Sequence, residues 1–412
     1  MTVHAQLMAI GTLYICYFGI REPLVQTQVL PYLRQLAEAG IKVHLLTFEP
    51  RLREDWSANE LASQREQLVT ESINWFCLPY HKSPTLPATL YDIRAGARFA
   101  VQLARREGIE VLHARAHVPM AMALWARKFV SVKLIFDIRG LMAEEYRDAG
   151  IWTERSLAFR LVKALERAGI RRADQIVVLT ERLREWLVSS RLKNVNQIEV
   201  IPCCVDTERF ERQDSAGKDG ELSQGDRFEV IYAGSLIGLY LVEELGRFFQ
   251  AIKRKRPDAF LRILSVSPPE QGTAALSRAG LSETDFDIRK VSPSDVPAYL
   301  RHARLGVSFR KPAFAQLAAS PTKIPEYLAA GLPVVCNAGI GDMDELVQRE
   351  QVGVVLRHFD DDAYQKAADE ALLIAQGPDI REHCRRVAWV NFDLQTVGGA
   401  RYVNVYRRLA ER

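Results

Sequence analysis

Short apolar runs alternate with amphipathic stretches along most of this chain. Residues 13–18, 42–47 and 133–137 are mainly apolar and are bounded by turn residues, as is typical of strands buried in a parallel sheet. Residues 26–39 have apolar positions three and four residues apart and are followed by Gly40, so a helix is predicted there. The first part of the chain therefore predicts repeated strand–helix–strand units.

The same alternation returns after a polar stretch. Residues 211–226 are rich in Gly, Ser, Asp and Lys and contain almost no aliphatic residues, which is typical of a linker. Beyond them, residues 229–233, 261–266, 287–291 and 305–309 predict strands, and residues 242–255 and 295–302 predict helices. We therefore predict an α/β protein with domains at 1–210 and 227–380, a linker at 211–226 and a helical tail at 381–412.

Composition narrows the class of protein. A length of 412 residues suits two domains, and 48% apolar with 26% charged residues is typical of a globular protein. A net charge of +4 gives little support to nucleic-acid binding. The six cysteines include no C-x-x-C pair, which favours reduced thiols in the cytoplasm. Residues 5–20 lack a basic flank and a cleavage site, so they predict a buried strand and not a signal peptide.

Residues 320–337 combine a helix start, a short helix, a stop and a strand. Ser320 before Pro321 is a helix-start signal, with Thr322 as the alternative cap, and Gly331 ends the helix. The helix start favours an anion, and Lys323 adds a full positive charge there. Glu326 follows about one turn later.

This segment resembles a known family signature. K-I-x-E-Y-L-A-x-G-x-P-V-V at residues 323–335 is similar to the nucleotide-sugar motif of glycosyltransferase family 4, whose retaining enzymes have the GT-B fold. That fold has two Rossmann-like doubly wound domains that face each other across a cleft, and its last helix often crosses back to the first domain. I-P-x-x-V-D at 201–206 and F-D-x-R-G with a later Glu and Trp from 136 to 152 resemble further segments of the family.

The resemblance assigns a donor site to the second domain. Glu326 is expected to bind the ribose hydroxyls of the donor nucleotide, and the turn before it to hold the diphosphate. The arginine and lysine that often clamp the diphosphate after the first strand of this domain are absent, so we expect Lys323 and Arg310 to replace them. The family's first glutamate is Ala318 here, which leaves the sugar open. The donor-binding residues we predict are Gly234, Ser235, Arg289, Val291, Ser320, Thr322, Lys323 and Glu326.

The acceptor is expected at loops that follow the strands of the first domain. The first of these loops lacks the glycine pair common in the family, so side chains are expected to make its contacts. His117 is a candidate near the reacting centre, with His113 or a purely structural histidine as alternatives. Arg139 and Glu145 either contact the acceptor or pair with each other. The acceptor-binding residues we predict are Arg21, Gln28, Arg115, Asp137, Arg139 and Glu145.

The resemblance implies a retaining glycosyltransferase that moves a sugar from a nucleoside diphosphate donor to a lipid-linked or cell-surface glycan. Lys323, Arg310, Glu326 and His117 are its predicted catalytic residues. No cofactor and no metal are expected, because the D-x-D sequences at 285–287 and 342–344 are interpreted as surface charge and as a helix cap starting at Asp342. A nucleotide-sugar epimerase of the same fold and a non-catalytic sugar-nucleotide-binding protein are the alternatives. A dehydrogenase is disfavoured because neither domain has G-x-G-x-x-G after its first strand.

Residues 155–172 are basic and carry an apolar stripe. Such a helix either touches an anionic membrane surface or packs on the domain with a solvated basic face. No run reaches the 18 or so apolar residues of a membrane span. The expected location is the cytoplasm, with peripheral contact at the inner face of the membrane as the further expectation.

Overall fold

The chain divides into two compact units. The computed structural model describes residues 10–211 and 227–411, so the predicted linker lies outside the described residues except for its first position. One unit comprises Met1–Pro202 with Leu394–Arg412, and the other comprises Cys203–Asp393. The division comes at Pro202, before the predicted boundary at residue 210, because Val205 and Phe210 pack into a core of the second unit.

The first unit is built on a seven-stranded parallel sheet. Its order is β3-β2-β1-β4-β5-β6-β7, so the chain reverses direction across the sheet between β1 and β4. Every residue of β1 is buried, as expected of a central strand covered on both faces. The strands are β1 (Gly11–Cys16), β2 (Lys42–Pro50), β3 (Ile73–Tyr80), β4 (Ile109–Arg115), β5 (Lys133–Asp137), β6 (Gln175–Val178) and β7 (Ile198–Val200).

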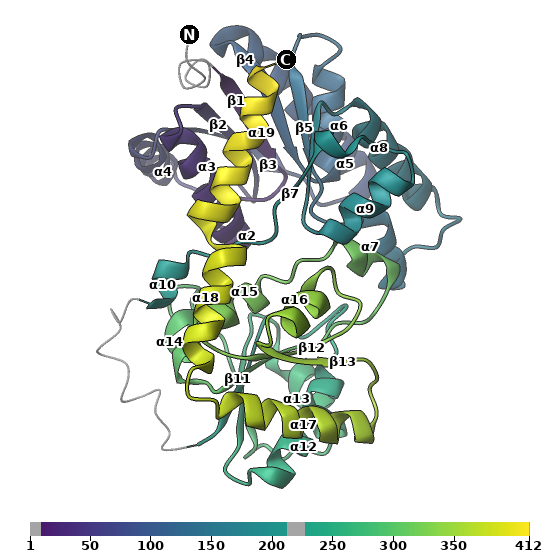
Figure 1. Cartoon of the computed structure of the whole chain (residues 1–412). Coiled ribbons are helices and arrows are strands. Elements are labelled where there is room, and N and C mark those ends of the chain that lie inside the picture. The colour runs from purple at the N-terminus through teal and green to yellow at the C-terminus, as the bar shows by residue number, and fades with distance from the viewer. Residues whose placement is uncertain (1–9, 212–226, 412) are drawn as a thin grey trace. The chain divides into compact units, whose positions relative to one another are not determined.

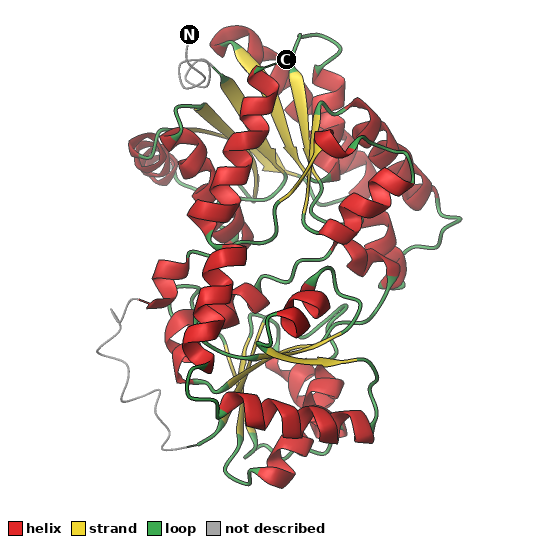
Figure 2. Ribbon diagram, in the orientation of Figure 1, coloured by secondary structure: helices red, strands yellow, loops and turns green. Residues whose placement is uncertain are grey.

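Helices flank this sheet, as Figures 1 and 2 show. α3 packs against α19, while α6 packs against both α5 and α8. The helices of the first unit are α2 (Pro23–Gln28), α3 (Leu30–Glu38), α4 (Ala58–Thr70), α5 (Thr85–Glu107), α6 (His117–Ala126), α7 (Met142–Asp148), α8 (Leu157–Arg172), α9 (Glu181–Ser189) and α19 (Ala400–Ala410), with the π-helix η3 (Leu394–Gly399) before the last.

The helix predicted at residues 26–39 is wrong in detail, because two helices occupy this stretch. α2 ends at Gln28 and α3 begins at Leu30, with Val29 between them at φ −127° and ψ −65°. Pro31 lies in the first turn of α3. Proline lacks the N–H that a continuous helix would need there, so the second helix starts at this point.

The second unit has a six-stranded parallel sheet in the order β10-β9-β8-β11-β12-β13. The chain reverses direction across this sheet between the neighbouring strands β8 and β11. The strands are β8 (Glu229–Ala233), β9 (Phe260–Leu264), β10 (Phe286–Arg289), β11 (Leu305–Ser308), β12 (Val334–Asn337) and β13 (Gly353–Leu356). The two sheets confirm the predicted α/β class with two doubly wound units.

The helices of the second unit lie on both sides of this sheet (Figure 2). α12 packs against α13 and α17, and α15 packs against α18. They are α10 (Thr207–Glu211), α12 (Val242–Lys255), α13 (Pro269–Arg278), α14 (Val296–His302), the 3₁₀-helix η2 (Phe314–Ala318), α15 (Lys323–Ala329), α16 (Met343–Arg349), α17 (Asp361–Ala375) and α18 (Ile380–Phe392). Within residues 10–211 and 227–411, no helix is both long and apolar enough to cross a membrane.

Candidate functional site

Polar side chains of the second unit converge at the carboxyl ends of β8 and β11. Gly234 follows β8, Arg310 follows β11, and Lys323 opens α15. Ligands of open α/β sheets bind at such a point, where two adjacent strands lead to opposite sides of the sheet. The structure thus brings together three residues that lie up to 89 positions apart in the sequence.

Lys323 lies inside this site without a hydrogen-bond partner among the described residues. Its side chain is buried, with a relative exposure of 5%. The ammonium lies 4.0 Å from the ring centre of Tyr232 and 4.4 Å from that of Tyr240. Burial lowers the pKa of Lys323 well below its usual value, and the charge of Arg310 lowers it further while Glu326 opposes the shift. An unpaired buried cation of this kind is costly, so it points to an anionic ligand.

Gly234 leaves room for this ammonium. Its φ is +147°, a backbone conformation that favours glycine. A Cβ atom at this position would lie 2.7 Å from Nζ of Lys323. The backbone N–H of Gly234 donates to the carbonyl of Leu264 at 2.9 Å, which extends the sheet to this residue. The glycine therefore allows the loop after β8 to pass close over the lysine.

Arg310 is held beside the same aromatic ring. Its guanidinium carbon lies 5.0 Å from the ring centre of Tyr240, and its Nη1 donates to the Tyr240 hydroxyl at 3.4 Å. Nε donates to Oε1 of the buried Gln316 at 2.8 Å. The backbone N–H of Arg310 donates to Oδ1 of Asn337 at 2.8 Å. These contacts fix a second positive charge near Lys323.

Glu326 lies one turn into α15 and is half-buried. Burial raises the pKa of Glu326 to about 7, against the opposing charges of Arg209 and Lys323. Its carboxyl group therefore changes ionisation near neutral pH. When this carboxyl group is ionised, both of its oxygens can accept hydrogen bonds from hydroxyl groups of a ligand.

The predicted cap of α15 is wrong. The hydroxyl of Ser320 accepts a hydrogen bond from the backbone N–H of Cys203 at 3.1 Å. Thr322 is the residue before the helix, but its backbone is helical and its side chain makes no cap hydrogen bond. Similarly, Asp342 precedes α16 without a side-chain cap. Ser320 is instead used to tie residue 203 to the start of this segment.

The remaining predicted donor residues lie on other elements of the second unit. Ser235 Oγ lies 3.3 Å from Ser267 Oγ, so the loops after β8 and β9 touch. Arg289 ends β10, where its side chain pairs with Asp287. Val291 is half-buried and packs against the apolar core of the second unit that includes Tyr327 and Leu328 of α15. Ala318 is fully buried in η2.

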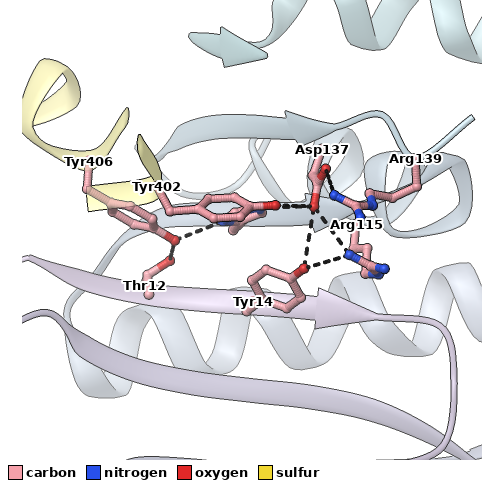
Figure 3. A network of polar contacts seen from close by, with 8 residues as sticks. Thr12, Tyr14, Arg115, Asp137, Arg139, Tyr402 and Tyr406 are labelled. Carbon is pink, nitrogen blue, oxygen red and sulfur yellow. Dashed lines mark hydrogen bonds and ion pairs between the residues drawn. The ribbon is translucent and has the colours of Figure 1, made fainter. Parts of the chain in front are cut away.

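In the first unit, Asp137 is the centre of a buried polar network (Figure 3). Tyr402 of α19 donates to its Oδ2 at 2.9 Å, and Tyr14 of β1 does so at 3.5 Å. Arg115 Nη1 lies 3.6 Å from Oδ2, and Arg139 Nη1 lies 3.5 Å from Oδ1. Three of the predicted acceptor residues thus meet: Arg115 and Arg139 both pair with Asp137 inside the unit.

The charges explain the ionisation of this network. Burial alone would raise the pKa of Asp137, but the charges of Arg139 and Arg115, together with His113, whose Nε2 lies 3.8 Å from Oδ2, hold it below its usual value. Burial lowers the pKa of His113, which is therefore neutral at pH 7. Its Nδ1 lies 2.9 Å from the Tyr406 hydroxyl, which lies 2.9 Å from that of Thr12. The network links α19 to β1, β4 and β5.

His117 is the first residue of α6 and is buried. Its Nε2 lies 3.0 Å from Oε2 of Glu166, whose other oxygen lies 2.5 Å from Nζ of Lys163. Lys163 also pairs with Glu144 at 2.7 Å. The preceding residue, Ala116, has φ +68°, which is uncommon for a residue other than glycine and is associated with functional turns. A carboxylate therefore orients the imidazole, an arrangement shared by proton-transferring and purely structural histidines, so the role of His117 stays a prediction.

The other predicted acceptor residues are placed separately. The Arg21 guanidinium lies 3.6 Å from the ring centre of Trp56 and pairs with Glu60 at 3.0 Å, so it is engaged on the surface. Gln28 is buried at the end of α2. The Glu145 carboxylate lies over Gly140, where a Cβ atom would come within 2.2 Å of Oε1.

Sequence reasoning missed the aromatic and amide parts of the donor site. Tyr232 resembles any apolar strand residue, and Gln316 lies in the short 3₁₀-helix η2, so neither gives a local signal. Tyr240 follows a glycine-containing loop that was recognised only as lacking the family's basic residues. Within the described parts of the chain, no group of three or more His, Cys, Asp or Glu residues is arranged to hold a metal ion.

Comparisons with known proteins agree with this architecture. Residues 25–209 match the family model described as Glycosyltransferase Family 4, so the resemblance seen in the sequence is confirmed. No curated protein sequence matches the chain.

Solved structures share its fold at low sequence identity. Sucrose-phosphate synthase from Thermosynechococcus elongatus has a TM-score of 0.74 at 15% identity, over 97% of this chain and 99% of the other. A glycosyltransferase from Rickettsia africae ESF-5 has a TM-score of 0.71 at 12% identity, over 98% and 99%. Anabaena HepE in complex with UDP and glucose has a TM-score of 0.68 at 14% identity, over 96% and 99%. The predicted GT-B fold is therefore confirmed.

Proposed function

We propose that this chain, a glycosyltransferase of the GT-B type by family match and fold, transfers a sugar from a nucleoside diphosphate donor with retention at the anomeric carbon. The acceptor we propose is a lipid-linked or cell-surface glycan, used at the inner face of a membrane. The observation that carries the proposal is the buried, unpaired ammonium of Lys323 at the carboxyl edge of the second sheet.

The donor site has the charge that a diphosphate needs. Departure of the nucleoside diphosphate leaves negative charge on its phosphate oxygens, and catalysis consists largely of stabilising that charge. Lys323 and Arg310 supply two cations, both within about 5 Å of the centre of the Tyr240 ring. Both are positioned before the ligand arrives, one by aromatic rings and one by Gln316 and Tyr240. Because these side chains supply the positive charge, we propose that no divalent ion is needed.

Glu326 supplies the second part of donor recognition. Ribose presents two neighbouring hydroxyl groups, which a carboxylate binds as paired acceptors. Glu326 lies one turn of α15 beyond Lys323, so a nucleoside whose phosphates meet the lysine presents its ribose along the same helix. HepE, which shares the fold, binds UDP and UDP-glucose. Uridine diphosphate is therefore the first nucleotide to test here.

The decisive experiment is a thermal-shift panel with UDP, GDP, ADP and their common sugar conjugates. A nucleotide at 100 times its Kd stabilises the protein by about 2.7 kcal/mol. We expect one nucleotide to shift wild-type protein but neither Lys323→Met nor Glu326→Ala. Lys366→Met, which changes an exposed lysine of α17, is the matched control and should behave as wild type. Equal shifts in all four proteins would refute the donor site.

Product analysis then separates transfer from other chemistry. With the stabilising nucleotide sugar and a panel of glycan acceptors, we expect a glycoside of unchanged anomeric configuration. If the donor alone is converted to a different sugar nucleotide, the activity is epimerisation and not sugar transfer. Donor binding without any product across the acceptor panel would favour a non-catalytic sugar-nucleotide-binding protein.

A further inference from the structure

α8 in the first unit has an exposed apolar stripe. Its inner face packs on β5, α6 and α7 (Figure 1). Leu157 and Leu161 lie one helical turn apart on the opposite face, with relative exposures of 65% and 53%. Ile151, shortly before the helix, is also 65% exposed. Large aliphatic side chains gathered on one outer surface indicate an interaction site more often than single exposed ones do.

Arginines border this stripe. Arg160, Arg167 and Arg171 are spaced seven and four residues apart, so they follow one side of the helix, and Arg155 precedes it. All four side chains are exposed, and none forms an ion pair within residues 10–211 and 227–411. Residues 155–172 contain six basic residues and one acidic residue. That acid, Glu166, is buried against His117 and Lys163, so it does not neutralise the outer surface.

A helix of similar length in the second unit shows the contrast. In α12, the exposed Arg247 pairs with Glu243 at 2.8 Å. α12 has no large hydrophobic side chain among those that are exposed. An ordinary solvated helix is thus built differently in this chain. The surface of α8 combines free positive charge with exposed leucines.

We propose that the outward surface formed by residues 151–171, the α8 surface, binds an anionic lipid bilayer. Arginines border an apolar stripe on helices that lie in the interface, where the aliphatic side chains enter the headgroup region and the arginines meet lipid phosphates. The charge complementarity selects anionic lipid over a neutral bilayer. The inference rests on the proposed lipid-linked acceptor for its purpose, since it holds the enzyme where that acceptor lies.

Cosedimentation of the full chain with vesicles tests the α8 surface without donor or acceptor. The vesicles contain either phosphatidylcholine alone or phosphatidylcholine mixed with phosphatidylglycerol. We expect binding to rise with the anionic fraction and to fall between 0.15 M and 1 M salt, where the Debye length shortens from about 8 Å to about 3 Å. Removing two charges should weaken binding about 25-fold, at about fivefold for each basic residue.

Paired variants make the test specific. Arg160→Gln with Arg167→Gln removes charge, and Leu157→Ser with Leu161→Ser removes the apolar stripe; both pairs should lose binding. Arg254→Gln with Lys366→Gln removes two exposed charges from the second unit and should bind as wild type. Equal loss in this control pair, no loss in the α8 variants, or equal binding of wild type to neutral vesicles would overturn the proposal.

Two further measurements separate the explanations. All variants should keep the nucleotide-dependent thermal shift, so failure of vesicle binding with that shift intact overturns the membrane surface and leaves the proposed donor site standing. Sedimentation velocity without lipid should show the same state for wild type and Leu157→Ser/Leu161→Ser. Self-association of wild type that this variant abolishes would assign the α8 surface to a second copy of the chain and overturn lipid binding.

Discussion

Lys323→Met should make the ligand-free protein more stable and the enzyme much slower. Lys323 is 5% exposed, and its ammonium lacks a hydrogen-bond partner among the described residues and lies within 4.4 Å of two tyrosine ring centres. Replacing buried charge by apolar side chains of similar volume stabilises proteins by about 1–4 kcal/mol, from which up to about 2 kcal/mol of lost cation–π attraction must be subtracted. With the middle value of each range, about 2.5 minus about 1 kcal/mol, the expected net gain is about 1–2 kcal/mol.

The assay is thermal unfolding without ligand. For a unit of this size, a gain of about 1–2 kcal/mol raises Tm by about 2–8 °C. Methionine suits the place because its thioether packs well against aromatic rings. Lys366→Met should leave Tm unchanged, because that side chain is exposed.

The pH dependence gives the sign of the charge effect. Since the pKa of Lys323 is lowered in the folded protein, the cost of burying its charge is fully present below that folded pKa. As pH rises through the folded pKa towards the unfolded value near 10.5, folded protein loses the charge first and wild type gains stability. The advantage of Lys323→Met should therefore shrink with rising pH.

Catalysis should respond in the opposite direction. We expect kcat to fall about 10²–10³-fold, as when one preorganised donor to a developing negative charge is removed. The reasoning is refuted if Lys323→Met is less stable than wild type near neutral pH, or if it turns over at a normal rate.

Three other variants test separate parts of the structure. Burial raises the pKa of Glu326 to about 7, so lowering the pH from about 8 to about 6 should protonate most of the carboxyl and weaken donor binding, measured by calorimetry, about tenfold. Glu326→Gln should abolish this pH dependence, and an equally steep profile in the variant would contradict the role of the carboxylate. Gly234→Ala should lower the free energy of unfolding in urea by about 1–3 kcal/mol and also weaken donor binding. The control Gly238→Ala, at φ +77° with no atom within 4 Å of its Cβ, should lose stability alone. Unchanged donor affinity in Gly234→Ala would exclude the close approach to the lysine. Tyr406→Phe should destabilise the first unit by about 1–3 kcal/mol in urea, because Thr12 and His113 lose a buried hydrogen-bond partner. An unaltered unfolding midpoint would show that the Tyr406 hydroxyl does not contribute to stability.

The central strands and the donor helix were predictable from the sequence because their signals are local. β5 and β11 are short apolar runs followed by polar loops, and Lys323 with Glu326 lies in one continuous motif. The edge strand β3 was harder to recognise. β3 is only partly buried, contains Pro79 and has a single neighbouring strand, so its pattern is neither fully apolar nor strictly alternating.

Contacts between distant residues could not be predicted. Tyr240 and Arg310 lie 70 positions apart and meet only because the loop after β8 pairs with the chain after β11. Asp137 was predicted to face an acceptor, and its predicted role stays a prediction, but its saturation by Tyr402 depends on a helix 265 positions later. Ser320 was predicted as a helix cap, yet its hydroxyl accepts a hydrogen bond from the backbone N–H of Cys203. Each of these partners is fixed by topology, which a single sequence does not display.

The placement of α19 affects the order in which the protein folds during synthesis. Tyr402 and Tyr406 complete the buried network of the first unit, yet about 200 residues separate them from β7, the last strand of that unit's sheet. At about 5–20 residues per second, a ribosome needs roughly 10–40 s to translate these residues. During that interval Asp137, His113 and Thr12 lack their partners from α19. The buried polar network of the first unit can therefore be completed only after the second unit has been made.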